Sequence, residues 1–220
     1  MRHLREIAVG ALSGGMMVIA TSGASASTLT THYSFDPEAD LLNDGVLVKA
    51  SNFGDGATAV TVNGISFDTD YSNTDLASPS QTSTYYGGSD PGVADLMNNQ
   101  INLGRTASSG ASTLTIALTG LTVGHNYRAQ AIYGNDGSYP AIDMFILGEG
   151  DAWLEHQWID IGTAGQTLLA VYEFEAATEA VTIGVNANWD LGETNHFDFM
   201  GYAVHNTTVP ERAVLHPVPV

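Results

Sequence analysis

Aromatic and acidic side chains gather in three segments rich in glycine and polar residues, at positions 134–140, 148–158 and 186–196. An aromatic ring can stack on the apolar face of a sugar, while neighbouring carboxylates and amides accept hydrogen bonds from its hydroxyls. The alternative is that each tryptophan only closes one end of a core. The residues predicted to bind a ligand are Asp136, Tyr139, Trp153, Trp158, Trp189 and Asp190.

Catalysis is not predicted. The sequence contains no nucleophile elbow, zinc-protease pair, phosphate-binding loop or EF-hand loop, and it has no cysteine. Acidic clusters occur around Glu149, Asp151 and Glu155, but a chain with 24 acidic residues forms such clusters freely. Glycoside hydrolysis would require two carboxyl groups facing each other at roughly 5–10 Å. We therefore assign no catalytic residue and keep a glycan-active enzyme as the weakest alternative.

The sequence does not identify a set of metal ligands. His196 and Asp198 alternate on one expected strand and share a face, but no third ligand is identifiable. We favour a hydrogen-bonded surface pair over a metal site as the explanation for these two residues. Residues 52–56 and 134–138 offer the oxygen ligands that calcium prefers. Tight turns select the same Asn, Asp and Gly residues without any metal. Two alternatives therefore stay open: no cofactor, or a structural calcium ion.

The first 26 residues have the order of a secretory signal peptide. Arg2 and Arg5 precede an apolar run at 7–20, which is followed by an Ala-x-Ala site ending at Ala26. The run is short and rich in glycine for a transmembrane anchor. We predict a signal peptide at 1–26, a single β-sandwich domain at 27–205 and a flexible tail at 206–220. The mature protein is expected outside the cell or on its surface.

Charge limits the partners. The formal net charge is −18 at pH 7, and the acidic residues are scattered along the chain. Such a protein repels nucleic acid and anionic lipid. We therefore expect no nucleic-acid partner, and no membrane span in the mature chain. The aromatic and polar segments instead favour a polysaccharide or exopolysaccharide as the partner.

Alternating apolar and polar residues indicate strands bounded by Gly, Asn and Asp. Asn63–Gly64 between two short apolar runs predicts a tight hairpin. Asp90 and Pro91 could begin one short helix. The fold class is all-β, an antiparallel two-sheet β-sandwich of jelly-roll type with at most one short helix; a closed barrel is the alternative. The expected strands are at 46–50, 60–62, 65–67, 113–118, 126–133, 141–147, 167–174, 180–185 and 197–204. The expected core residues are Leu114, Ile116, Leu118, Tyr127, Ala129, Ala131, Phe145, Leu147, Val171, Val181, Ile183, Phe197 and Phe199.

A resemblance rests on the order of several segments. These are VLVKASNFG at 46–54, VNGISF at 62–67, LTGLTVGHNY at 118–127, QAIY at 130–133 with Asn135 and Asp136, TAGQTL at 163–168 and GYAV at 201–204. Together they resemble exported bacterial PEP-CTERM-type proteins with a galactose-binding-like jelly-roll β-sandwich. The resemblance implies a binding site at loops at one end of the sandwich, and it allows a structural calcium ion.

The C-terminus departs from this pattern. Val209, Pro210 and Glu211 look like the start of the sorting tail, but Arg212 stands where proline is expected. The residues that follow hold no membrane-spanning run, so the tail is degenerate or missing and free secretion is favoured. The function predicted from the sequence is a secreted or cell-surface, non-catalytic, carbohydrate-binding module. The alternative is a structural extracellular-matrix or surface protein without a specific small ligand.

Overall fold

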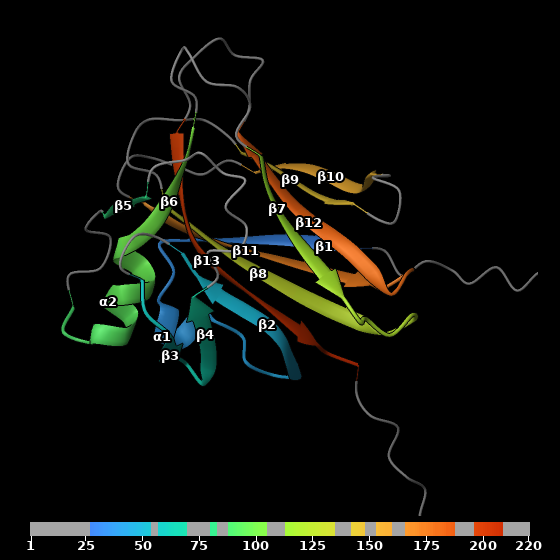
Figure 1. Cartoon of the computed structure of the whole chain (residues 1–220), viewed down its shortest axis with the longest axis horizontal. Helices are drawn as coiled ribbons and strands as arrows, with labels where there is room; N and C mark the ends of the chain where they lie inside the picture. The colour runs from blue at the N-terminus through green and yellow to red at the C-terminus, as the bar shows by residue number, and fades with distance from the viewer. Residues whose placement is uncertain are drawn as a thin grey trace, which may run out of the picture.

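The computed structural model describes residues 27–53, 57–69, 80–82, 88–104, 113–134, 142–147, 153–159, 166–187 and 196–208. Most of these residues lie in strands (Figure 1). The elements are β1 (Thr28–Tyr33), α1 (Pro37–Asp40), β2 (Val46–Asn52), β3 (Val60–Val62), β4 (Ile65–Thr69), β5 (Ser80–Thr82), α2 (Pro91–Asn98), β6 (Asn99–Gly104), β7 (Thr113–Thr119), β8 (Asn126–Gly134), β9 (Ile142–Leu147), β10 (Trp153–Ile159), β11 (Thr167–Glu175), β12 (Ala180–Ala187) and β13 (His196–Asn206).

Two sheets form the body of the protein. The larger has the strand order β1-β11-β8-β13-β2-β4-β3, with β6 paired to β13 and β5 paired to β6. The smaller has the order β10-β9-β12-β7. Among these pairs, β2 and β4 run parallel and the others antiparallel. The predicted all-β sandwich is confirmed, with one short helix more than expected because α1 joins α2.

The larger sheet is packed on both faces. Ile116 of β7 and Ile183 of β12 belong to a first core together with Tyr133 and Tyr172 of the larger sheet. Ile132, which alternates with Tyr133, belongs to a second core with Leu96 of α2 and other residues of α2 and the β3–β4 hairpin. Figure 1 shows the smaller sheet on one side of the larger sheet and α1, α2, β3 and β4 on the other. Because both faces of the larger sheet are covered, β8 and β11 need apolar residues on both faces.

The expected core residues whose side chains the structure describes are all buried. They are Ile116, Leu118, Tyr127, Ala129, Ala131, Val171, Val181, Ile183 and Phe199. Val171 contributes to the second core and the others to the first. The side chains of Leu114, Phe145, Leu147 and Phe197 lie outside the described part.

Local signals in the sequence explain two of the connecting elements. Asn63 and Gly64 adopt positive φ angles of 46° and 76°, as the two central residues of a type I′ hairpin turn do. Val62 then pairs with Ile65 across the turn. At the start of α2, the Asp90 carboxylate accepts the N–H groups of Gly92 (2.8 Å) and Val93 (2.9 Å). Both the hairpin and the helix are confirmed.

The described residues continue to Thr208, and β13 itself extends to Asn206. The Thr207 N–H donates to the Asn126 carbonyl oxygen of β8 (2.8 Å), which ties the end of β13 to the sheet. The expected signal peptide, 1–26, and residues 209–220 lie outside the described residues. Within the described part, none of the helices has the length and apolar character needed to cross a bilayer.

Candidate functional site

The strand register shows which loops share an end of the sandwich. In the larger sheet, Gly134 at the end of β8 pairs with Asp198 near the start of β13 and with Thr167 at the start of β11. In the smaller sheet, Ile142 at the start of β9 pairs with Ala187 at the end of β12 and with Ile159 at the end of β10. These six strand ends therefore belong to one edge of each sheet.

Four connections between the sheets start and finish at these edges. Residues 135–141 join β8 to β9, 160–165 join β10 to β11, and 188–195 join β12 to β13. Residues 105–112 join β6 to β7. The end of β6, Gly104, pairs with His196, and the start of β7, Thr113, pairs with Asn186. We call this end of the sandwich, defined by the strand ends flanking these four connections, the loop end.

The opposite end is closed by short turns. The Leu121 N–H donates to the Glu179 oxygen (3.0 Å), and the Gly124 N–H donates to the Ala176 oxygen (2.8 Å), so the turns after β7 and β11 are bonded to each other. The hydroxyl of the buried Tyr127 accepts the Thr122 N–H (2.8 Å). Because these backbone groups already have partners, the loop end is the better place for a variable binding surface.

The predicted binding residues divide between the two ends. Trp158 pairs with Asp143, one residue from the loop end, whereas Trp153 pairs with Leu147 at the far end of the same two strands. At about 3.4 Å per residue, the Cα atoms of the two tryptophans are about 17 Å apart along β10. Residues 153–158 were expected in a loop, and this expectation is wrong: they lie on β10, at the edge of the smaller sheet.

The remaining predicted residues lie outside the described part. Asp136 and Tyr139 belong to the connection that leaves Gly134, and Trp189 and Asp190 belong to the connection that enters β13. Both connections have their flanking strands at the loop end. The register therefore places Trp158 and the strand ends that flank these two segments at one end of the fold, and it places Trp153 at the other.

The structure describes the side chain of one member of the candidate metal pair, Asp198. Asp198 is fully buried on β13 and pairs with Gly134, which puts it at the base of the loop end. The side chain of His196 lies outside the described residues, as do 54–56 and 135–138 of the proposed calcium loops. Within the described residues no group of three or more His, Asp or Glu side chains could hold a metal ion.

Asp95 is a carboxylate close to the predicted calcium loop at 52–56, and its hydrogen bonds are to protein groups. Its Oδ2 accepts hydrogen bonds from Asn52 Nδ2 (2.9 Å), the Thr58 N–H (2.9 Å) and the Thr58 hydroxyl (3.1 Å). Its Oδ1 accepts from Asn99 Nδ2 (2.7 Å). This carboxylate therefore fastens the chain around Thr58 to α2 and has its oxygens occupied by protein donors.

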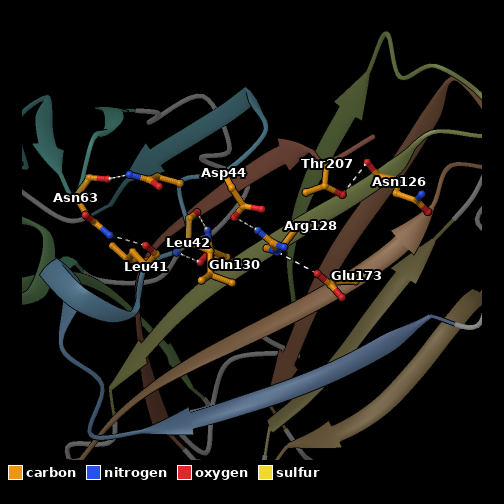
Figure 2. A network of polar contacts seen from close by, with 10 residues as sticks. Leu41, Leu42, Asp44, Asn63, Asn126, Arg128, Gln130, Glu173 and Thr207 are labelled. Atoms are coloured by element: carbon orange, nitrogen blue, oxygen red, sulfur yellow. Dashed lines mark hydrogen bonds and ion pairs between the residues drawn. The ribbon is translucent and has the colours of Figure 1, made fainter. Parts of the chain in front are cut away.

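A polar network fixes the segment between α1 and β2 across the larger sheet (Figure 2). The fully buried Gln130 of β8 donates to the Leu42 oxygen (2.7 Å) and accepts the Leu42 N–H (2.8 Å). Arg128 of the same strand bridges Asp44 and Glu173. Its guanidinium, bonded to Asp44, holds the pKa of that carboxyl below its ordinary value. The network is structural: it fixes where β2 begins.

A groove lies where β2 and β4 separate. The two strands pair only at Ser51 with Asp68 and at Asn52 with Thr69, and a cavity of about 340 Å³ opens beside this short pairing. Lys49, Ser51, Ser66, Asp68 and Thr69 line it together with apolar residues of β2. The sequence analysis did not identify this groove. Three consecutive exposed apolar residues at the start of β2 were the available signal.

The protein is thus a two-sheet β-sandwich with four sheet-to-sheet connections at the loop end and two short ones, after β7 and β11, at the opposite end. No protein-family model matches the chain, and no curated protein is significantly similar to it. Similar solved structures include the C-terminal domain of EclA, a sugar-binding protein, with a TM-score of 0.32 and 18% identity over 46% of this chain and 80% of that one.

Two further neighbours were found. The enzymatically active domain of tailspike protein 4 of bacteriophage CBA120 has a TM-score of 0.39 and 9% identity over 82% of this chain and 19% of that one. A structure described as "CBM4 structure and function" has a TM-score of 0.28 and 19% identity over 55% of this chain and 64% of that one. The chain therefore spans less than two thirds of both proteins, and TM-scores this low assign it no function.

Proposed function

We propose that this protein is an exported, non-catalytic β-sandwich module that binds polysaccharide at the loop end. The observation that supports the proposal is the strand register, which places Trp158 and the strand ends flanking the connections that hold Asp136, Tyr139, Trp189 and Asp190 at one end of the fold. These are the residue types that stack on sugar rings and accept sugar hydroxyls. The proposed site comprises these residues and excludes Trp153.

The architecture supports such a site because the connections leave rigid supports. β8 and β13 are packed on both faces, and their ends at Gly134 and Asp198 are buried. A binding surface mounted on strands that do not move loses little affinity to ordering of the protein. Loop sequences can then change with the sugar while the sheets stay the same.

The two tryptophans of β10 provide a matched test. Binding to a panel of immobilised polysaccharides, with and without calcium, identifies the sugar. Isothermal titration with that sugar then compares Trp158→Ala, Trp189→Ala and Trp153→Ala. Buried tryptophans at binding hot spots contribute about 2 kcal/mol or more, so we expect Trp158→Ala and Trp189→Ala to weaken binding about thirtyfold or more. Trp153→Ala, at the other end of β10, should bind as the wild type does.

Each result of this test has a definite meaning. Equal losses with Trp153→Ala and Trp158→Ala would refute the loop end as the site. Binding to no polysaccharide in the panel would favour the alternative of a structural matrix protein. Loss of binding on calcium removal would add a calcium ion to the proposal. Release of reducing sugar during incubation would overturn the non-catalytic assignment.

Export and the bacterial PEP-CTERM-type relationship are part of the same proposal. The basic, apolar and small-residue order of residues 1–26 supports export. N-terminal sequencing of the protein recovered from the medium of a secreting bacterial host should begin at Ser27. A mature N-terminus at Met1 would refute the proposed signal peptide.

A further inference from the structure

The groove between β2 and β4, which we call the fork, is bounded by strand edges. β13 occupies one side of β2, and β4 occupies the other side only at Ser51 and Asn52. From Val46 to Val48, no strand of the described residues runs along the β4 side. The N–H and C=O groups of such an edge pair readily with another extended chain.

The side chains at this edge lack the usual protection. Val46 is 71% exposed, Leu47 37% and Val48 40%, so three consecutive apolar residues face solvent at the start of the strand. Exposed edges are normally blocked by charges, proline or a covering loop. The nearest charge in this strand is Lys49, whose ammonium lies 6.0 Å from the centre of the Tyr202 ring. The open stretch itself therefore carries no charge that would deter a partner strand.

The described end of the chain, Thr207 and Thr208, is hydrogen-bonded to β8. The Thr207 N–H donates to the Asn126 oxygen, and the Asn126 N–H donates to the Thr208 hydroxyl. Asn126 belongs to β8, which flanks β13 on the side away from β2. The described end of the chain therefore does not occupy the fork.

Charge decides between the possible partners. A second copy would bring another chain of net charge −18 to this one, which repels association at long range. A cationic chain is attracted by the same net charge, and the fork itself is lined by the exposed carboxylate of Asp68 together with one cation, Lys49. Apolar residues alternating with the cations would lie on the face of the sheet that holds Val46 and Val48, while the backbone pairs with β2.

We propose that the fork is a docking site for an extended, cationic and partly apolar polypeptide segment, which adds a strand beside β2. The segment supplies backbone donors and acceptors at strand spacing, and its lysine or arginine side chains lie near the acidic surface. This interaction is separate from the proposed sugar binding, since the loop end is formed by other strand ends.

The test uses a labelled peptide of about eight residues, which exceeds the usual strand length, with alternating valine and lysine. Its counterpart has glutamate in place of lysine. Fluorescence anisotropy measures binding to the full chain, and hydrogen exchange reports protection of β2. We expect the lysine peptide to bind, to protect the amides of Val46–Val48 and to weaken as salt rises. The glutamate peptide should not bind.

Two substitutions locate the interaction. Val48→Lys places a repelling charge at the fork and should weaken peptide binding about tenfold or more. Thr30→Lys makes the same charge change on the exposed β1, the opposite edge strand of the larger sheet, and should leave binding within about twofold. Circular dichroism checks that both variants fold.

Three results would overturn the proposal. One is equal binding of the lysine and glutamate peptides, and another is equal weakening by the two substitutions. The third is binding without protection of β2 in the wild-type protein, a result that does not depend on any variant folding. A dimer in sedimentation experiments that protects Val46–Val48 would assign the fork to a second copy instead.

Discussion

Gln130 offers the sharpest test of how this sandwich is held together. Its side chain is fully buried, and its amide makes two hydrogen bonds to the backbone of Leu42, at 2.7 and 2.8 Å. Gln130→Met keeps the length of the side chain but removes both bonds. A neutral hydrogen bond contributes about 1 kcal/mol net, so the free energy of unfolding should fall by about 2 kcal/mol.

Urea denaturation of the wild type and the variant measures this change, and hydrogen exchange at the Leu42 amide shows whether it arises there. Gln130→Glu is the matched control because its oxygen can still accept the Leu42 N–H. At neutral pH it cannot donate to the Leu42 oxygen and buries a charge, whereas the protonated acid restores both bonds. We therefore expect the deficit of Gln130→Glu to shrink as pH falls. Wild-type stability and unchanged Leu42 exchange in Gln130→Met would refute this account.

Three further predictions concern the cores and the central strand. Ile116→Ala, at a residue 1% exposed, should cost about 2–5 kcal/mol in urea denaturation. Burial, followed by the charge of Arg128, lowers the pKa of His205 below its ordinary 6.5, so the unfolded chain binds more protons. Stability should therefore fall as pH drops below about 6.5, and His205→Gln should remove that part of the pH dependence measured by denaturation. A Cβ at Gly201 would lie 2.8 Å from a backbone oxygen of β2, so Gly201→Ala should lower the melting temperature, by an amount that corresponds to about 1–3 kcal/mol.

Much of the fold was predictable because its signals are local. The hairpin at Asn63 and Gly64 and the start of α2 at Asp90 follow from φ preferences and capping, which involve only neighbouring residues. The alternation in residues 113–118 places Ile116 and Leu118 on one buried face. Strands such as β1 and β10 were missed because polar residues interrupt their alternation, and pairing with β11 and β9 compensates.

The candidate sites were less predictable because they depend on pairing between distant segments. The types of residue at the loop end were visible, but only the register of β9 and β10 shows that Trp158 and Trp153 lie at opposite ends. The fork arises where β4 meets β2 at Ser51 and Asn52 and then diverges. A parallel contact of this kind leaves no periodic signal, since the chain that connects the two strands, with β3 and the hairpin turn, sets their positions.

The two proposed sites lie at opposite ends of β13. Asp198 pairs with Gly134 at the loop end, whereas His205 pairs with Leu47 beside the fork. The seven residues from Asp198 to His205 correspond to about 24 Å, and the four residues to Tyr202, which pairs with Ser51 of the fork, to about 14 Å. Both exceed the distance over which substitutions usually interact. The sheet between them is packed on both faces, so neither site can shift without disturbing a core. Sugar and peptide binding should therefore be independent: Trp158→Ala should leave peptide affinity unchanged, and Val48→Lys should leave sugar affinity unchanged. A module built in this way could hold a polysaccharide at one end and a polypeptide at the other, and mutual weakening of the two ligands would show that the strand transmits strain.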